Sequence, residues 1–358
     1  MFAKKNLVAA AALLALAGAA QAQVKLYGMI DMSVGSFEDS HVKGDDARVT
    51  AVESGKMMTS YFGISGSEDL GGGLKAEFAL ESFLAGDTGA NVPNLSNGFW
   101  GRGSFLALSG GFGKVAIGQY DNPLFTYGYT YNPFGSSMAF SPTMRHYYYG
   151  MANVGQSSVV VDGDTKSLAG VGIDTGFVNS VTYETPNMGG FMGTLQYSPK
   201  ESGDSASYSA AVSYSAGPFS AALTYVKSGI STAYDSDEKV WALGASYDFG
   251  VAKAFLQYTA IDQDASTAGD LGAQAANEDK IYQIGVSVPL SDKASVMASY
   301  GKLTNKLDAT GAKEKDSVFS LGYNYMLSKR TDVYGVFTNN QTTSLESGQT
   351  FAVGIRHN

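Results

Sequence analysis

The chain has 358 residues, of which 44 are glycine and 22 are tyrosine, whereas only 16% are charged. A content of 44% hydrophobic and 12% aromatic residues excludes an intrinsically disordered chain. The absence of cysteine excludes a disulfide framework, a thiol catalyst and a cysteine metal site. A mean hydropathy of −0.06 is too low for a bundle of membrane-spanning helices, and the charged fraction is below the ~25% of ordinary soluble proteins.

The first 22 residues contain the three parts of a secretory signal peptide. Lys4 and Lys5 give a positive start, residues 7–20 form an apolar stretch, and residues 20–22 (AQA) form a small-residue cleavage site. The apolar stretch is shorter than the ~20 residues that a transmembrane helix needs. We therefore expect a signal peptide at 1–22 and a single domain over residues 23–358.

The charge balance constrains the partners. The signal peptide contains two of the 24 basic residues and none of the 33 acidic ones, so the processed chain has a formal net charge of −11. Nucleic acid binding needs a basic surface, so the charge argues against a nucleic acid partner. With three histidines and no cysteine, the sequence also predicts no metal site and no cofactor.

From residue 24 onward, one pattern repeats: segments of about ten residues in which apolar side chains alternate with small or polar ones. A period of two indicates a β-strand with one apolar face. In the first segment, Leu26, Ile30 and Val34 share one face, and Lys25 and Asp31 share the other. We expect sixteen strands, at residues 24–35, 56–67, 74–83, 99–109, 114–120, 177–185, 191–198, 208–216, 219–226, 240–249, 251–261, 280–288, 294–301, 317–326, 331–338 and 350–357.

Short and long connections alternate between these segments. The short turns are rich in glycine, as at 68–73 and 110–113. The long connections are 36–55, 121–176, 262–279, 302–316 and 339–349. Short turns on one side and long loops on the other are typical of a transmembrane β-barrel, whose closed strands leave no backbone group unpaired in lipid. A secreted β-sandwich is less consistent with the pattern, because soluble strands are usually only ~5–6 residues long.

Tyrosines concentrate near the ends of the segments, as aromatic belts at the two membrane surfaces require. The members are Tyr197, Tyr214, Tyr225, Tyr247, Tyr258, Tyr300, Tyr323, Tyr325 and Tyr334. The opposite face is rich in small and polar residues, which favours a water-filled interior.

Several motifs resemble the trimeric Gram-negative porins of the β-proteobacterial and neisserial type. They are YGMID at 27–31, FGISGSEDLGGGLKA at 62–76, LSGGFG at 108–113, NPFG at 132–135, NSVTY at 179–183 and VGIRH at 353–357. The resemblance implies an all-β, 16-stranded antiparallel transmembrane β-barrel in the bacterial outer membrane, a homotrimer, and a third external loop folded into the lumen. It also implies a water-filled channel for passive diffusion of small hydrophilic solutes and ions, in contact with outer-membrane lipid and lipopolysaccharide.

The segment 121–176 occupies the place of that third loop, after the fifth expected strand. It is far longer than the usual connections of compact domains, which suggests a functional loop. The segment starts at Asp121, is rich in aromatic residues such as Phe134, and carries the base Arg145. Folded inward, it would set the width and the electric field of a pore.

The expected pore wall departs from the porin pattern in its basic residues. The resemblance implies bases at the positions of Tyr61 and Gln119, near Ser65, and around Gly176, just before the NSV motif, where this chain has none. Arg102 alone matches one of the expected basic positions. The wall opposite the loop is therefore predicted to be depleted of positive charge.

Acidic residues fall on the same expected lumen face. They are Asp31, Glu77 and Glu81, with Lys75 among them. Rings of acidic side chains favour cations, and rings of Arg or Lys favour anions. We therefore predict a pore that is less anion-selective than its relatives, or weakly cation-selective.

Other functions fit the sequence less well. An outer-membrane hydrolase needs a nucleophile, a histidine and an acid together. His41, His146 and His357 have no nucleophile motif nearby, so we interpret them as solvated loop or rim residues and expect no enzyme. A plugged structural barrel conflicts with small inward residues such as Ser209 and Ala242. The main alternative is a substrate-selective channel for sugars or aromatic or organic acids, with the tyrosines of 121–176 as a stacking track.

Overall fold

The computed structural model describes residues 24–44, 47–91, 98–148, 157–161, 164–168, 175–200, 206–229, 237–265, 276–307, 311 and 313–358. The expected signal peptide lies outside these residues, as do parts of the segment 121–176. The described chain is nearly all β-sheet, with two short helices, α2 (Pro123–Thr130) and α3 (Pro142–Tyr148). No helix among the described residues is long and apolar enough to cross a membrane.

Eighteen strands form one sheet, and two more form a separate hairpin. The sheet contains β1 (Lys25–Phe37), β2 (Val49–Ser54), β3 (Tyr61–Gly71), β4 (Leu74–Ala85), β5 (Ala90–Asn91), β6 (Gly103–Gly110), β7 (Gly113–Gln119), β10 (Ser180–Glu184), β11 (Phe191–Ser198), β12 (Ser207–Ala216), β13 (Phe219–Gly229), β14 (Asp237–Asp248), β15 (Lys253–Gln263), β16 (Asn277–Pro289), β17 (Ala294–Leu307), β18 (Lys313–Met326), β19 (Thr331–Thr342) and β20 (Gly348–His357). The hairpin contains β8 (Ser157–Val161) and β9 (Asp164–Leu168).

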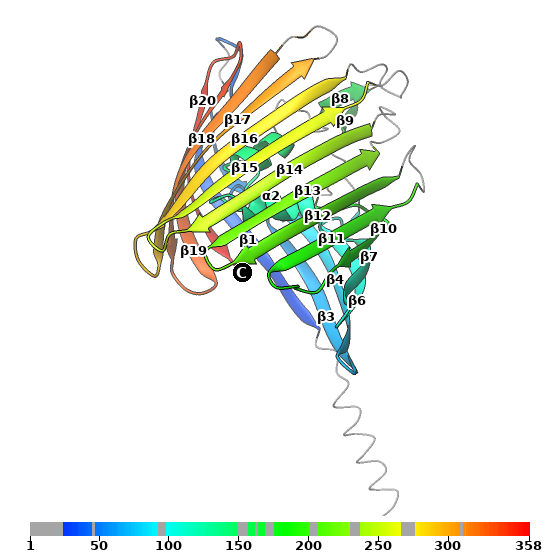
Figure 1. Ribbon diagram of the computed structural model, residues 1–358. Coiled ribbons are helices and arrows are strands. Elements are labelled where there is room, and N and C mark those ends of the chain that lie inside the picture. Colours follow the sequence, from blue (N-terminus) through cyan, green and yellow to red (C-terminus); the bar gives the residue numbers. More distant parts are fainter. Residues whose placement is uncertain are drawn as a thin grey trace, which may run out of the picture.

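Neighbouring strands pair antiparallel around the sheet, and β20 pairs with β1, which closes the sheet into a barrel of tilted strands (Figure 1). The closing register runs from Ile30 opposite His357 to Ser36 opposite Phe351. Two of the eighteen strands do not add to the circumference of the barrel. One is β5, which has only two residues. The other is β2, because β2 and β3 pair with successive halves of β1 and together form one interrupted barrel strand. The barrel therefore has sixteen strands, which confirms the predicted fold.

The structure differs from the expected element bounds in several places. The expected first loop, 36–55, contains β2, and the second barrel strand is interrupted at 55–60, where the chain turns inward. The segment 121–176 is not free of regular structure, since it contains α2, α3 and the β8–β9 hairpin. Many strands also extend past their expected ends, because backbone pairing continues where both faces have become polar.

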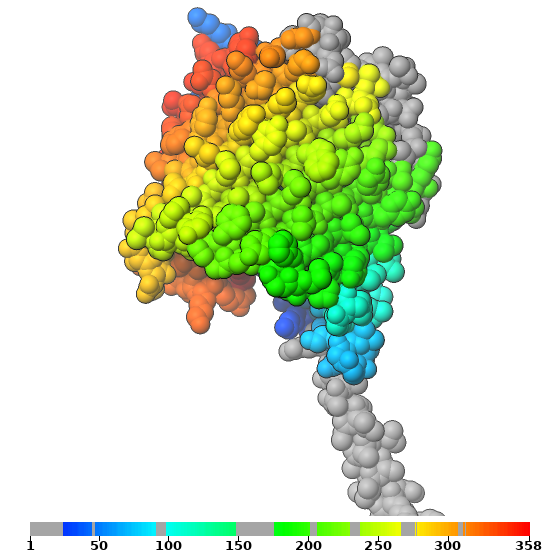
Figure 2. Space-filling view, viewed as in Figure 1, coloured from blue at the N-terminus to red at the C-terminus, as the bar shows by residue number. Residues whose placement is uncertain are grey.

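The outward face of the wall is apolar and exposed. Leu26, Ile30 and Val34 of β1 are 78%, 44% and 49% exposed, whereas Asp31 on the other face is fully buried. Figure 2 shows this outer wall as a continuous surface over the strands that face the viewer. The alternation predicted from the sequence thus separates an outer apolar face from an inner polar one.

Two rows of aromatic side chains mark the outer wall. The row near the long connections contains Tyr208, Tyr225, Trp241, Tyr258, Tyr282 and Tyr300, and the row near the short turns contains Phe191, Tyr214, Phe219, Tyr247, Tyr323 and Tyr325. On β14, Trp241 belongs to the first row and Tyr247 to the second. The six-residue spacing between them corresponds to about 20 Å along the strand, since a strand rises ~3.3 Å per residue. This separation is close to the ~25 Å apolar band of membrane barrels. Tyr334 was wrongly expected in these belts: it faces the interior and is 3% exposed.

Inside the barrel, an apolar layer crosses five neighbouring strands. Its members, Val226, Val240, Ile261, Ile281 and Leu303, pack with Leu124 and Phe125 of α2 and with Met144 and Tyr147 of α3. Hydrogen bonds fix both helices to the wall. Gln257 Nε2 donates to the Gly128 carbonyl at 2.9 Å, and Gln283 Oε1 accepts from the Thr143 N–H at 2.6 Å. The helices therefore lie against the inward face of β13–β17.

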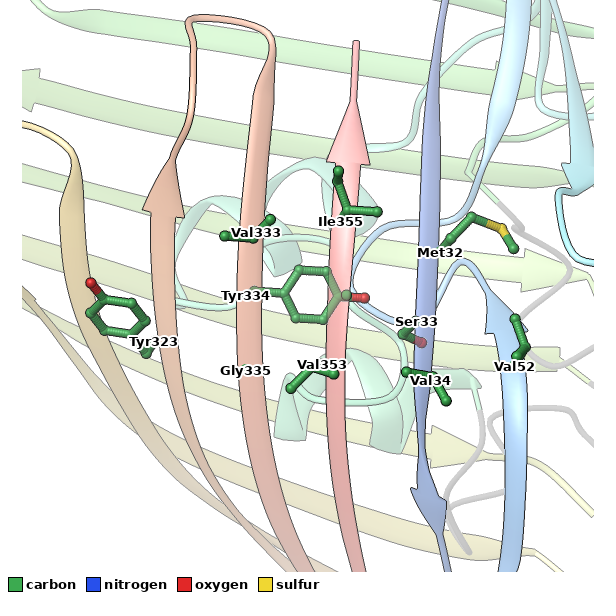
Figure 3. A pocket seen from close by; sticks show the side chains of 11 residues that line it. Met32, Ser33, Val34, Val52, Tyr323, Val333, Tyr334, Gly335, Val353 and Ile355 are labelled. Carbon is green, nitrogen blue, oxygen red and sulfur yellow. The ribbon is translucent and has the colours of Figure 1, made fainter.

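Asp31 connects β1 to two other parts of the barrel. Its carboxylate accepts hydrogen bonds from the N–H groups of Met57 and Met58 at 2.7 and 2.9 Å, and from the Tyr334 hydroxyl at 2.8 Å. Tyr334 lies on β19, and its ring crosses β20 to reach β1 (Figure 3). Gly354 makes this crossing possible, because a Cβ there would lie 2.3 Å from the ring. Asp31 therefore holds both the inward turn and the junction where the barrel closes.

We expect Asp31→Ala to lower the free energy of unfolding by about 2–4 kcal/mol, because buried donors of Met57, Met58 and Tyr334 would lose a charged acceptor. The measurement is the temperature at which the folded barrel unfolds in detergent, followed by its electrophoretic mobility. Asp69→Ala, in an exposed turn, is the matched control. An Asp31→Ala barrel as stable as this control would contradict the assigned role.

Candidate functional site

A cavity of about 430 Å³ lies inside the barrel, between the wall and the chain around α2. Its lining combines two guanidinium groups and one carboxylate with apolar and aromatic side chains. The members are Met57, Met58, Arg102, Asp121, Phe125, Tyr129, Pro133, Phe134, Gly135, Ser136, Met297, Asn324 and Arg356. Charged groups and rings therefore meet in one confined space.

Arg102 lies just before β6 and is held by neighbours on the barrel wall. Its guanidinium forms an ion pair with Glu81 and lies 4.0 Å from the centre of the Tyr61 ring. Glu81 also accepts a hydrogen bond from the Tyr27 hydroxyl at 2.5 Å. Burial alone would lower the pKa of Arg102, but Glu81 and Asp121 outweigh burial, and the pKa is raised. Arg102 is thus a fixed positive charge whose field is offset by adjacent carboxylates.

Asp121 supplies the carboxylate of the cavity. It follows β7 and is half-buried. Burial raises the pKa of Asp121 to about 6; the positive charge of Arg102 opposes this shift, and the negative charge of Glu81 adds to it. The cavity therefore gains negative charge as the pH rises through this value.

Arg356 reaches the same cavity from the last strand. Its Nε and Nη2 donate to Oδ2 of Asp332, on the neighbouring strand β19, at 3.1 and 2.8 Å. The guanidinium also lies 6.0 Å from the centre of the Tyr334 ring. Both arginines of the cavity are therefore paired with carboxylates.

The sequence around Asn122 explains how α2 is placed. The Asn122 side-chain oxygen accepts from the Leu124 N–H at 2.9 Å and caps the helix, and Pro123 is well suited to the first helical position. Asn122 Nδ2 also donates to Gln196 Oε1 at 2.8 Å and to Ser209 Oγ at 3.0 Å, both on the inner wall. One buried side chain therefore starts the helix and anchors it to β11 and β12.

One turn of α2 presents two rings to the cavity. Phe125 and Tyr129 are four residues apart, so they share one face of the helix. Their rings are in edge-to-face contact, with centroids 5.3 Å apart. This face gives the cavity an aromatic side, which also includes Phe134.

The structure brings five of the ten predicted pore residues together. Arg102, Asp121 and Phe134 line the cavity, and Tyr61 and Glu81 contact the guanidinium of Arg102. Of these, Phe134 is 3% exposed and also packs with the cluster around Met57 and Tyr334.

The other five predicted residues lie elsewhere. Asp31 is fully buried beneath the inward turn, so it braces the wall and does not face open water. Gln119 is also buried, and its Nε2 donates to the Gly101 carbonyl at 2.6 Å. Lys75 is exposed at the short-turn end of β4, where Glu77 pairs with Lys114 at 3.1 Å. Arg145 pairs with Asp39 of an external loop at 2.7 Å.

The cavity contains residues outside the predicted set. The alternation of the last strand, with Val353 and Ile355 outward, is sufficient to place Arg356 inward. The spacing of four residues between Phe125 and Tyr129 likewise places both rings on one face of a helix. No comparable signal exists for Met57 and Met58, because alternation alone assigns Met58 to the apolar outer face.

His146 was expected to be a solvated loop residue, and this expectation is wrong. It is fully buried in α3, and its Nδ1 lies 3.6 Å from Oδ2 of Asp316 on β18. Burial, assisted by the charge of Arg145, lowers the pKa of His146 to about 3. His146 is therefore a neutral packing residue, because α3 lies against the wall.

Comparison with known proteins adds the biological context. A family model described as Gram-negative porin matches residues 9–345. The chain belongs to this family of porins. Outer membrane porin protein 32 of Delftia acidovorans is 34% identical to it, over 99% of this chain and 95% of the relative.

Solved structures agree in fold. An anion-selective porin from Comamonas acidovorans superposes with a TM-score of 0.72 at 28% identity, covering 94% of this chain and 99% of the other. The trimer form of OmpT of Vibrio cholerae has a TM-score of 0.65 at 14% identity, covering 94% and 98%. The protein is thus an outer-membrane porin, a channel for passive diffusion, and its relatives are channels rather than enzymes.

We expect Glu81→Gln to shift the ion selectivity of this porin toward anions, because Arg102 loses its paired charge while the side chain keeps its size. The ratio of chloride to potassium permeability, measured from reversal potentials in a KCl gradient, should rise by roughly twofold or more. Glu77→Gln is the control. Glu77 lies on the same face of β4 as Glu81, but it pairs with Lys114, and neither residue lines the cavity. An unchanged ratio in Glu81→Gln would contradict this reading of Arg102.

The Asp121 carboxylate should make the ion selectivity of the channel depend on pH. Because its pKa is raised to about 6, its negative charge is present above that pH and is lost as the pH falls through it. Chloride permeability relative to potassium should therefore rise between about pH 7.5 and about pH 5. Asp121→Asn should remove this change, since the amide does not titrate. An equal pH response in wild type and variant would show that other groups cause it.

Proposed function

We propose that this porin is a general diffusion channel narrowed by the segment that contains α2 and α3, and that it acts without catalysis. The supporting observation is the cavity inside the barrel, where Arg102, Asp121 and Arg356 are combined with the aromatic face of α2. Small hydrophilic solutes and ions would pass between the charged wall and these rings. Larger solutes would be excluded by the chain around α2.

We further propose that the channel does not favour anions. The similar porin from Comamonas acidovorans is described as anion-selective. In this chain the two cavity arginines are paired with Glu81 and Asp332, and Asp121 adds another carboxylate. Since acidic linings favour cations, we expect the channel to be equally permeable to potassium and chloride, or to have a modest preference for potassium.

We propose a homotrimer as the working form. An apolar hollow on the outer wall crosses the closing junction, and its floor includes Gly335 and Gly354. Figure 3 places Val34, Val333 and Val353 around it. Small residues let apolar surfaces approach closely within a membrane, and a porin of the same fold has a trimer form. Neighbouring barrels would pack at this hollow.

The aromatic side of the cavity supports a second candidate, a channel selective for aromatic or organic acids. Phe125 and Tyr129 lie in the same cavity as two guanidinium groups. A ring and a carboxylate of one solute could then contact rings and guanidinium together. The pairing of both arginines favours the general channel over this candidate, because Arg102 and Arg356 each already have a carboxylate partner.

Single-channel conductance with graded neutral sugars and polyethylene glycols distinguishes the two candidates. For a general channel, conductance should follow the conductivity of the bath, and benzoate should not block it at submillimolar concentration. Tyr129→Ala should raise conductance, because it removes a ring from the cavity, whereas Tyr197→Ala on the outer wall should leave it unchanged. Saturable block by benzoate that Tyr129→Ala abolishes would favour the selective channel instead.

A further inference from the structure

A group of polar side chains is buried on the inward face of β13, β14, β15, β16 and β17, which are neighbours in the barrel wall (Figure 1). The members, named here the oxygen cluster, are Ser228, Glu238, Gln263, Asp279 and Asn305. None of them is more than 6% exposed. Each lies two residues from a member of the interior apolar layer, on the side of the long connections. None of them lines the cavity around Arg102, so the oxygen cluster is a separate feature of the interior.

The strand register brings the two carboxyl groups of the cluster close together. Glu238 lies opposite Ser228 on one side and opposite Gln263 on the other. Asp279 lies opposite Asn305, and it is two residues from the position opposite Gln263. Such diagonal neighbours on one face are about 7–8 Å apart. Gln263 therefore lies between the two carboxyl groups, and the charge of Asp279 acts on Glu238.

Several oxygen atoms of the cluster are buried and have no hydrogen-bond partner in the described part of the chain. They are Oγ of Ser228, Oε1 and Oε2 of Glu238, and Oδ2 of Asp279. The other carboxylate oxygen of Asp279 accepts a hydrogen bond from Asn305 Nδ2 at 2.7 Å. A buried carboxylate is costly unless donors or an opposite charge compensate it. These atoms therefore need a partner.

Other carboxylates that face the interior have a basic partner. Glu81 and Asp332 each pair with an arginine of the cavity. Among the described residues, no basic side chain pairs with Glu238 or Asp279, and no positive charge acts on either of them. The partner that the oxygen cluster needs is therefore a cation or a proton from solution.

The chemistry of the cluster favours a hard divalent cation. All of its unpaired atoms are oxygens, and calcium binds about 6–8 oxygen ligands from carboxylates, amide carbonyls and water in a flexible arrangement. Magnesium demands a compact octahedron and gives up its water reluctantly, so a buried set of side chains from five strands suits calcium better. One proton would satisfy a single oxygen atom, whereas one calcium ion can contact several.

We propose that the oxygen cluster binds one calcium ion, with Glu238 and Asp279 as its charged ligands. The amide of Gln263, between them, and the hydroxyl of Ser228 supply further oxygen atoms. The bound ion joins neighbouring strands of the wall at the end where the long connections begin, and it stabilises that end of the barrel. The proposal does not depend on the ion selectivity of the channel.

Isothermal titration of calcium chloride into the full-length porin in detergent tests the proposal. The porin is refolded without lipopolysaccharide, so that no lipid phosphate contributes to binding, and potassium chloride is present throughout. Wild type should bind one calcium ion per chain with a Kd of about 0.1–1 mM, the range of extracellular calcium modules. Glu238→Gln and Asp279→Asn should each weaken binding about tenfold or more, because each removes one of two charged ligands. The double variant should not bind calcium.

The matched control is the double variant with Asp262→Asn and Glu278→Gln. These two residues lie opposite each other on the outward face of β15 and β16, next to the cluster in sequence. The control removes the same charge from the same end of the barrel, and it should leave calcium binding unchanged.

Thermal unfolding gives a second readout that separates lost binding from misfolding. Calcium should raise the unfolding temperature of wild type and leave that of the Glu238 and Asp279 double variant unchanged. With a chelator present, this variant should be at least as stable as wild type, because two buried, uncompensated charges have been removed.

Absence of calcium binding to wild type would overturn the proposal, and so would equal binding by wild type and the Glu238 and Asp279 double variant. Binding of magnesium that is as tight as that of calcium would overturn calcium as the occupant.

Discussion

The requirement that every backbone N–H and C=O be paired within the protein governs this structure, because lipid offers no substitute partner. Sixteen strands meet it only if the last pairs with the first, and β20 does so along seven registered positions of β1. The closing junction is supported from inside. Asp31 accepts hydrogen bonds from Tyr334 across β20 and from the inward turn at Met57 and Met58. Closure and the shape of the interior are therefore linked through one carboxylate.

The same closure determines which charges the interior can hold. A charge inside the wall is costly unless it is paired. Arg102 is paired with Glu81, and Arg356 with Asp332, and each pair joins neighbouring strands. Pairing that stabilises the wall also weakens the attraction of these guanidinium groups for passing anions. The selectivity proposed for the channel thus follows from how the barrel accommodates its buried charge.

The sequence predicts the fold well because strand alternation depends on local residue types. Leu26, Ile30 and Val34 face outward as expected. The connections expected to be long at 302–316 and 339–349 are mostly strand, because β17, β18, β19 and β20 extend into them. The helix α2 has its own local signal, since Asn122 followed by Pro123 forms a cap and a first turn. Features of this kind need no knowledge of distant contacts.

The site is predicted only in part, because alternation assigns a face and says nothing about what covers it. Asp31 and Glu81 look alike in the sequence, yet one lies beneath the inward turn and the other faces Arg102. Arg145 is bound by Asp39, which is remote along the chain.

We propose that the paired arginines leave this porin without the anion preference described for a similar porin. The most direct test is the reversal potential of the wild-type channel in a planar bilayer across a gradient of potassium chloride at neutral pH. We expect a reversal potential at zero or on the side of potassium permeation. A potential that shows clear preference for chloride would contradict it.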